Sequence, residues 1–89
     1  MKRIVKRFGH SEAYDERKLY ASVFAAAQSV REPVPTAELI AEKVVSDVTI
    51  WIEPKHEVTS NDIRVQAAKH LKSYNPDAGY MYLHHRVVW

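Results

Sequence analysis

The chain of 89 residues contains no cysteine and only two glycines. Without cysteine it can form no disulfide, no thiolate metal site and no cysteine nucleophile. Two glycines are too few for a glycine-rich phosphate loop, and the sequence has no P-loop, Gly-x-Gly-x-x-Gly or Gly-x-Ser-x-Gly motif. No apolar run approaches the roughly 20 residues that span a bilayer. These absences predict a single domain without a catalytic constellation of its own and without a membrane span.

The chain also has little net charge and no histidine spacing typical of a metal site. The formal net charge is +2, which is too small to argue for nucleic-acid binding by bulk electrostatics. None of the five histidines forms a His-x-x-x-His pair, so no metal site is expected. The opening Met1-Lys2-Arg3 leads directly into a strand-like run, unlike a signal peptide. We therefore expect a cytoplasmic domain.

The N-terminal half shows a short hairpin followed by two helices. The β-branched pair Ile4-Val5 precedes Gly9, which predicts a hairpin over residues 3–14. Asp15 is a good N-cap for a helix over 16–30. Thr36 is expected to cap a second helix over 37–52, after a connection stiffened by two prolines. The β-branched end of that helix resembles a strand, but the polar residues beside it keep the helical period.

The C-terminal half predicts one more strand and two helices. Residues 56–59 have a brief extended pattern and are expected to lie beside the hairpin. Thr59 and Asp62 match a capping box that opens a helix over 60–74. Asn75 and Pro76 mark the start of a last helix over 76–87. The predicted fold class is α+β, a four-helix bundle capped by a small three-stranded sheet made of the hairpin and one short strand.

A basic stretch in the hairpin is the first candidate site. Lys6 and Arg7 lie on the hairpin, and Lys18 lies in the first turn of the helix that follows. Cationic side chains and the unpaired N–H groups of a helix start attract anions. The plain alternative is a solvated edge strand, which lysine protects from aggregation. Spacing alone leaves both interpretations open.

The order of these features resembles that of the ATP-cone family. ATP-cones are nucleotide-binding regulatory domains of many ribonucleotide reductases and of the bacterial repressor of their genes. The family begins with a pattern similar to Val-x-Lys-Arg-Asp-Gly-x-x-Glu-x-Phe-Asp-x-x-Lys-Ile, and here residues 4–19 read IVKRFGHSEAYDERKL. Residues 58–63, VTSNDI, resemble its Val-Ser-x-x-Asp-Ile segment, and residues 82–86, YLHHR, resemble its closing Tyr-x-x-Tyr-Arg. Phe8 stands in place of an Asp, and His85 in place of a Tyr.

The resemblance implies a role for each matching residue. Lys6, Arg7 and Lys18 would contact the triphosphate of ATP or dATP, assisted by Mg²⁺. The base and sugar would be contacted by Ile4, Glu12, Asp15 and Ser60, with Arg64 as a further candidate one turn along. Together with Leu19, which closes the first motif, the candidate nucleotide-binding residues are Ile4, Lys6, Arg7, Glu12, Asp15, Lys18, Leu19, Ser60 and Arg64.

The resemblance also implies regulation rather than catalysis. In the family, exchange between ATP and dATP changes oligomeric state or contacts with a catalytic partner. We therefore expect self-association or a partner of the ribonucleotide reductase type, with nucleic acid involved only indirectly and no membrane contact. Two other classes stay open on the residues alone. One is a small nucleic-acid-binding module that uses the basic N-terminal residues as a phosphate patch, and the other is a helical interaction domain without a ligand.

Overall fold

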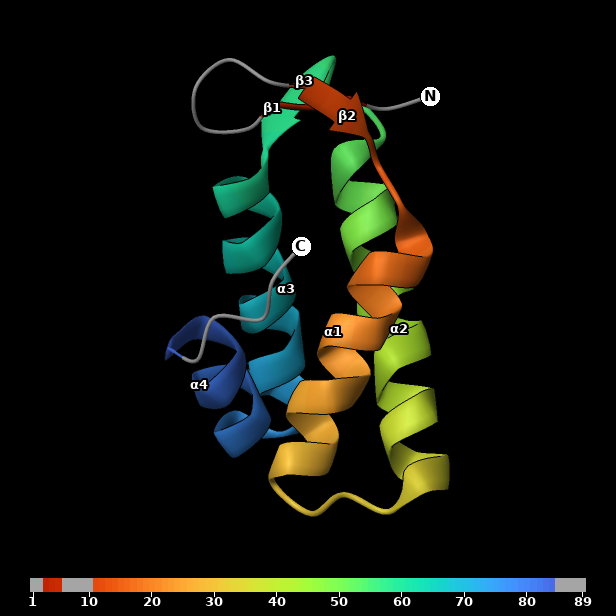
Figure 1. Ribbon diagram of the computed structural model, residues 1–89, viewed down its shortest axis with the longest axis vertical. Helices are drawn as coiled ribbons and strands as arrows, with labels where there is room; N and C mark the ends of the chain where they lie inside the picture. Colours follow the sequence, from red (N-terminus) through yellow and green to blue (C-terminus); the bar gives the residue numbers. More distant parts are fainter. Residues whose placement is uncertain (1–2, 6–10, 85–89) are drawn as a thin grey trace.

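A computed structural model describes residues 3–5 and 11–84, and four helices and three short strands lie within them (Figure 1). In chain order they are β1 (Arg3–Val5), β2 (Ser11–Ala13), α1 (Glu16–Ser29), α2 (Val34–Ile52), β3 (Glu57–Thr59), α3 (Ser60–Tyr74) and α4 (Pro76–His84). The expected hairpin loop and the last three residues of the expected fourth helix lie outside the described residues.

Three helices begin where the sequence places a cap. Asp15 Oδ1 accepts a hydrogen bond from the Arg17 backbone N–H at 2.9 Å and begins α1. Thr59 and Asp62 form the predicted capping box at the start of α3, with bonds of 2.9 and 3.1 Å. Asn75 Oδ1 accepts from the Ala78 N–H at 3.0 Å and begins α4. Each cap satisfies one of the helix-start N–H groups that have no partner within the helix.

The start of α2 differs from the sequence prediction. The helix begins at Val34, three residues before the predicted start at 37, and Pro33 holds the cap position without a side-chain hydrogen bond. Thr36 therefore lies inside the first turn and does not cap the helix. Proline is tolerated there because the N–H groups of a first turn have no intrahelical acceptor. At the other end, the β-branched residues up to Ile52 are helical, as predicted.

The three strands pair in the order β2-β1-β3. β1 pairs with β2 antiparallel, with Ile4 opposite Glu12, and with β3 parallel, with Ile4 opposite Val58. The central strand of this sheet is thus β1, and β3 reaches it after a crossover of two helices. The sheet lies at one end of the helices, where α1 and α3 begin and α2 ends (Figure 1).

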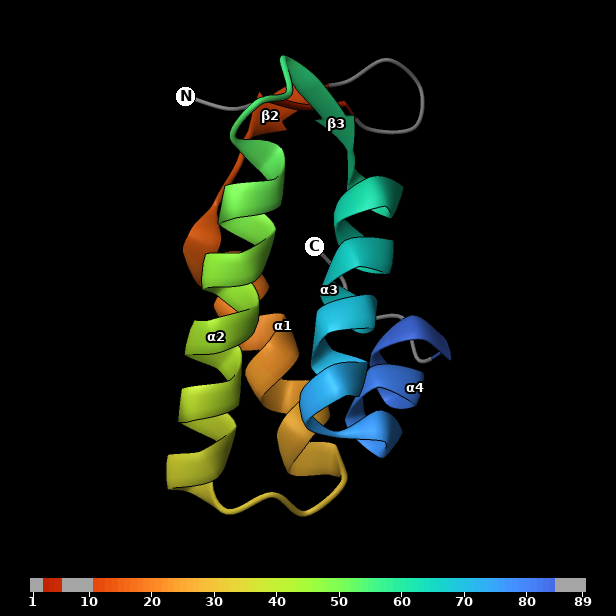
Figure 2. The ribbon, with the colours of Figure 1, turned by 180° about the vertical axis from the view of Figure 1, so that it is seen from behind.

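The core lies between the helices. Seen from behind, α2 and α3 run side by side and are joined through β3, and α4 packs beside the half of α3 farther from the sheet (Figure 2). The largest fully buried side chains are Leu19, Val23, Val44, Val48, Ile52, Ile63, Leu71 and Tyr82. The Tyr82 hydroxyl lies 3.0 Å from Ser22 Oγ, which itself donates to the Leu19 carbonyl at 2.8 Å. This pair satisfies the polar groups that α1 and α4 bury.

The predicted fold class is wrong as a description of this domain, which is mainly helical. A four-helix bundle needs four helices of similar length side by side. Within the described residues α4 has 9 residues against 19 in α2, and this part covers only part of α3. Each strand has 3 residues, too few to form a separate layer over the helices. Side-chain periodicity predicted the elements, but it does not report how far each one extends along its neighbours.

Within the described part of the chain, no helix is both long enough and apolar enough to span a bilayer.

Candidate functional site

The end of the molecule that carries the sheet also collects two helix N-termini. α1 begins at Glu16 directly after β2, and α3 begins at Ser60 directly after β3 (Figure 1). The first turn of each helix exposes N–H groups without intrahelical acceptors and carries the positive end of the helix dipole. This end of the domain therefore favours a negatively charged ligand over a cationic one.

A shallow hollow of ≈ 460 Å³ lies at the junction of β2 and α1. Its walls consist of Ala13, Tyr14, Asp15, Glu16, Arg17 and Lys18. Lys18 is exposed, whereas the next residue, Leu19, is fully buried in the core. The hollow thus combines cationic side chains, carboxylates and a helix start, groups that can bind both the phosphates and the hydroxyl or amino groups of one ligand.

Asp15 is the carboxylate whose position in this hollow is best defined. One of its oxygens caps α1 through the bond to the Arg17 N–H. The Arg17 side chain also lies 3.9 Å from that oxygen, but its side chain is 96% exposed, so this ion pair contributes little. The cap occupies Oδ1, and that leaves Oδ2 with capacity to accept a hydrogen bond from a ligand.

Tyr14 connects the hollow to the second helix. Its hydroxyl lies 3.0 Å from Thr49 Oγ1 on α2, 35 residues further along the chain. Burial raises the pKa of Tyr14, the hydrogen bond with Thr49 opposes that rise, and the negative charge of Glu16 adds to it. A movement of the segment between β2 and α1 must therefore stretch or break a contact with α2.

The Tyr14 pKa predicts a loss of stability at alkaline pH. The folded protein holds the phenolic proton more tightly than the unfolded chain, in which the pKa is close to 10.0. The resulting stabilisation is complete below that pH and disappears as the pH rises through the higher pKa of the folded state. We expect the free energy of unfolding in urea to fall less steeply from about pH 9 to about pH 11 for Tyr14→Phe than for the parent. Equal slopes would contradict this assignment.

The strands bring two candidate residues together and leave two undescribed. Ile4 and Glu12 are register partners in the hairpin, so their backbones lie side by side. Lys6 and Arg7 lie outside the described residues. Val5, the last residue of β1, is opposite Thr59, the last residue of β3, and these two strands run parallel. Val5 and Thr59 therefore lie at the same end of the sheet, and Thr59 leads directly into α3 at Ser60.

The remaining candidates lie on or next to two helices, α1 and α3. Asp15 and Lys18 share the hollow, and Ser60 is half-buried at the start of α3. Arg64 donates from Nη1 to the Leu83 carbonyl at 2.9 Å and from Nη2 to Asn61 Oδ1 at 2.7 Å. It thus connects α3 to the last turn of α4. The buried Leu19 has no exposed surface for a ligand to contact.

The contact between Tyr14 and Thr49 is a feature of the site that the sequence did not predict. Their contact is long-range, and no spacing pattern along the chain indicates it. The hydroxyl at Tyr14, within the first motif, was the one available signal, because a half-buried tyrosine hydroxyl usually has a hydrogen-bond partner.

The described side chains include His, Asp and Glu, which can bind metal ions. Among them, no group of three or more His, Asp or Glu residues is placed to hold a metal ion. The hollow itself is lined by two carboxylates, Asp15 and Glu16, and by two cationic side chains, Arg17 and Lys18.

Comparison with known proteins produced one match. The model of the family described as the ATP cone domain matches residues 2–89, which is essentially the whole chain. The comparisons with curated proteins and with solved structures found no match.

Proposed function

The chain belongs to the ATP-cone family of nucleotide-binding regulatory domains, and on that basis we propose that it senses ATP and dATP at its sheet end and converts the difference into a change of assembly. The family binds adenine nucleotides and is regulatory rather than catalytic. The assembly is either a complex of several copies of this chain or a complex with a partner of the ribonucleotide reductase type.

One observation carries the position of the site. The hollow beside the N-terminus of α1 contains Asp15 and Lys18, two of the residues that the family motif predicts. A helix start and a cation favour phosphate oxygens, and a carboxylate beside them accepts hydrogen bonds from a ribose hydroxyl or a base amino group. The same three features together suit a nucleotide better than a simple inorganic anion, which a carboxylate would repel.

The proposed roles of the individual residues come from the family motif. In the proposal, Lys6, Arg7 and Lys18 would bind the triphosphate, and a bound Mg²⁺ would offset part of its negative charge. Glu12 and Asp15 bind the sugar or base by accepting hydrogen bonds. The parallel pairing of β1 with β3 supports a contribution from Ser60, because Val5, at the end of β1, is opposite Thr59, the residue directly before Ser60.

The contact between Tyr14 and Thr49 supplies a route from the hollow to α2. A nucleotide shifts an equilibrium between two assemblies only by binding one of them more tightly, so assembly must change nucleotide affinity by the same factor. ATP and dATP differ by one ribose hydroxyl. In the proposal, a carboxylate that binds this hydroxyl, such as Asp15, shifts the β2–α1 segment, and Tyr14 transmits the shift to α2.

Calorimetric titration of the chain with ATP, dATP and GTP in the presence of Mg²⁺ tests this function. We expect saturable heats for both adenine nucleotides and a weaker response to GTP. Light scattering on the same samples should report different mean masses with ATP and with dATP. The absence of heat from every nucleotide would contradict binding, and identical masses in all states would contradict the conversion into assembly.

A further inference from the structure

The close packing of α4 on α3 defines a second surface, distant from the sheet. At Gly79 of α4, an added Cβ would lie 2.7 Å from the Lys72 Cα of α3, closer than real Cβ contacts allow. The two backbones therefore approach each other to a degree that only glycine permits at this position. A groove of ≈ 370 Å³ lies along the line where these helices meet.

The groove has an apolar floor that is partly exposed. Val65 and Ala68 of α3 and Tyr80 and Leu83 of α4 contribute to it. Of these, Val65 is 44% exposed, Leu83 36% and Tyr80 60%, although all three are large apolar or aromatic side chains. The Tyr80 ring lies 4.3 Å from the His84 ring, centroid to centroid, so the neighbouring turn of α4 supports its orientation. Adjacent exposed apolar side chains of this kind mark an interaction surface more often than isolated ones do.

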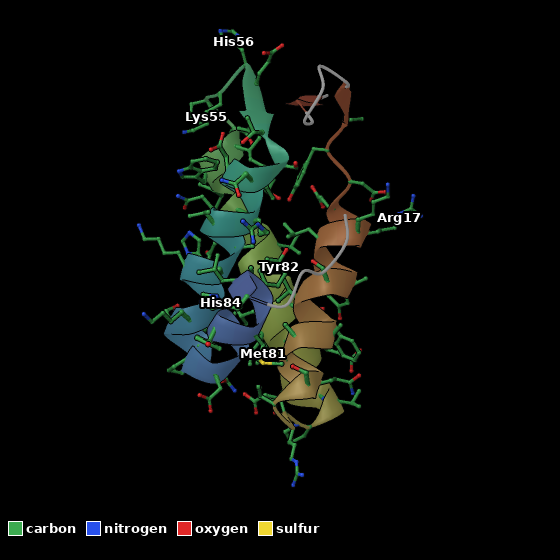
Figure 3. The ribbon with its side chains drawn as sticks, turned by 60° about the vertical axis from the view of Figure 1, so that its left-hand side comes forward. Arg17, Lys55, His56, Met81, Tyr82 and His84 are labelled. Atoms are coloured by element: carbon green, nitrogen blue, oxygen red, sulfur yellow. The ribbon has the colours of Figure 1, made fainter. Side chains whose placement is uncertain are left out.

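The rim of the groove carries positive charge. Lys69 and Lys72 line it on the α3 side, both exposed, and none of its described lining residues is acidic. The two aspartates of these helices act elsewhere: Asp62 belongs to the capping box of α3, and Asp77 lies in the first turn of α4 but does not line the groove. On α4, Tyr82 points into the core whereas His84 lies on the other side of the helix (Figure 3).

From this combination we propose that the α3–α4 groove binds an acidic amphipathic helix of a partner protein. Val65, Ala68, Lys69 and Lys72 follow one face of α3 over two turns, about 10 Å of helix axis. A partner helix of two to three turns can place apolar side chains at i, i+3 or i+4, and i+7 over Val65, Tyr80 and Leu83. Glutamate or aspartate beside those positions then faces Lys69 and Lys72, and a basic helix meets like charge and is disfavoured.

This surface is separate from the proposed nucleotide site. The hollow belongs to β2 and the first turn of α1, whereas the groove belongs to α3 and α4, which pack together away from the sheet (Figures 1 and 2). The hollow and the groove share no lining residue.

The test uses a fluorescently labelled helical peptide with leucine on one face and glutamate at the flanking positions. We expect anisotropy to show saturable binding that weakens with added salt, because exposed charges are screened. A control peptide with lysine in place of each glutamate should bind at least about tenfold more weakly. Equal binding of both peptides would overturn the charge argument, and no binding of either would overturn the proposal.

Variants locate the binding surface. Lys69→Glu/Lys72→Glu should weaken binding of the acidic peptide by about tenfold or more, and it should improve binding of the lysine peptide. Arg31→Glu reverses a single charge away from the groove, in the exposed connection between α1 and α2, and should leave both affinities within about twofold of the parent values at moderate salt. Because the lysines are exposed, far-ultraviolet circular dichroism should show unchanged helix content.

Two other occupants would overturn the proposal. If a second copy of this chain fills the groove, Lys69→Glu/Lys72→Glu should change the sedimentation mass of the protein without peptide. If the chain's own residues 85–89 fill it, their deletion should increase peptide affinity strongly. We expect neither effect.

Discussion

A Lys6→Ala variant should bind ATP roughly ten- to a hundredfold more weakly than the parent, because a charge-assisted hydrogen bond contributes about 1.5–3 kcal/mol. The resemblance to the family motif predicts that Lys6 contacts the triphosphate, and the register of β1 with β3 places the preceding Val5 opposite Thr59, the residue before α3. Calorimetric titration with ATP and Mg²⁺ measures the loss. ADP affinity should fall less than ATP affinity if Lys6 contacts the terminal phosphate.

Two further variants make that result specific. Lys18→Ala removes the cation on the wall of the hollow and should also weaken ATP binding. Lys69→Ala removes an exposed lysine of α3 from the α3–α4 groove and should leave ATP affinity unchanged. Thermal unfolding without nucleotide checks that all three variants fold. If Lys6→Ala and Lys69→Ala bind ATP equally well, the proposed phosphate site is wrong.

The second large expected effect concerns stability. Gly79→Ala should lower the free energy of unfolding by about 1 kcal/mol or more, and Gly79→Val by about 3 kcal/mol. Alanine gains up to about 1 kcal/mol of helix propensity over glycine, but its Cβ would lie 2.7 Å from Lys72 backbone atoms, which forces α4 away from α3. Urea unfolding monitored by circular dichroism measures the change.

Ala25 offers a matched comparison for the valine variant. It is exposed on α1, so Ala25→Val reports the helix-propensity cost of valine alone, about 0.5 kcal/mol. Replacing alanine by valine should lower the free energy of unfolding several times more at position 79 than at position 25. If Gly79→Ala is more stable than the parent, α4 can move away from α3 without a loss of stability, and the prediction is wrong.

The helix starts illustrate what can be predicted locally. Asp15, Thr59 with Asp62, and Asn75 were identified as caps, and each bonds a backbone group no more than three residues away. Such bonds depend on short-range geometry that the residue types already specify. The start of α2 was predicted wrongly for a related reason, since Pro35 is compatible both with a connection and with a first helical turn, and residue type alone does not decide between them.

The family motif predicts a set of site residues, and it does not say how their side chains lie relative to one another. The motif identified Asp15 and Lys18, which share one hollow, but it also included Leu19, which the core buries completely. Lys18 and Leu19 are neighbours in the chain, and a helix turns them to different faces. Arg64 was another candidate, and its guanidinium bonds to the end of α4, a contact across 19 residues.

The amino-acid sequence alone specified the helix caps, the order of strands and helices, and the absence of thiol chemistry. It also contains the family motif. Tertiary structure alone decided the contact of Tyr14 with Thr49, the buried pair of Ser22 and Tyr82, and the groove over Gly79. These features join residues 35 or 60 positions apart or depend on how closely two backbones approach. Their energies come from packing between surfaces that form only when the helices meet, and residue spacing within a single helix does not record them.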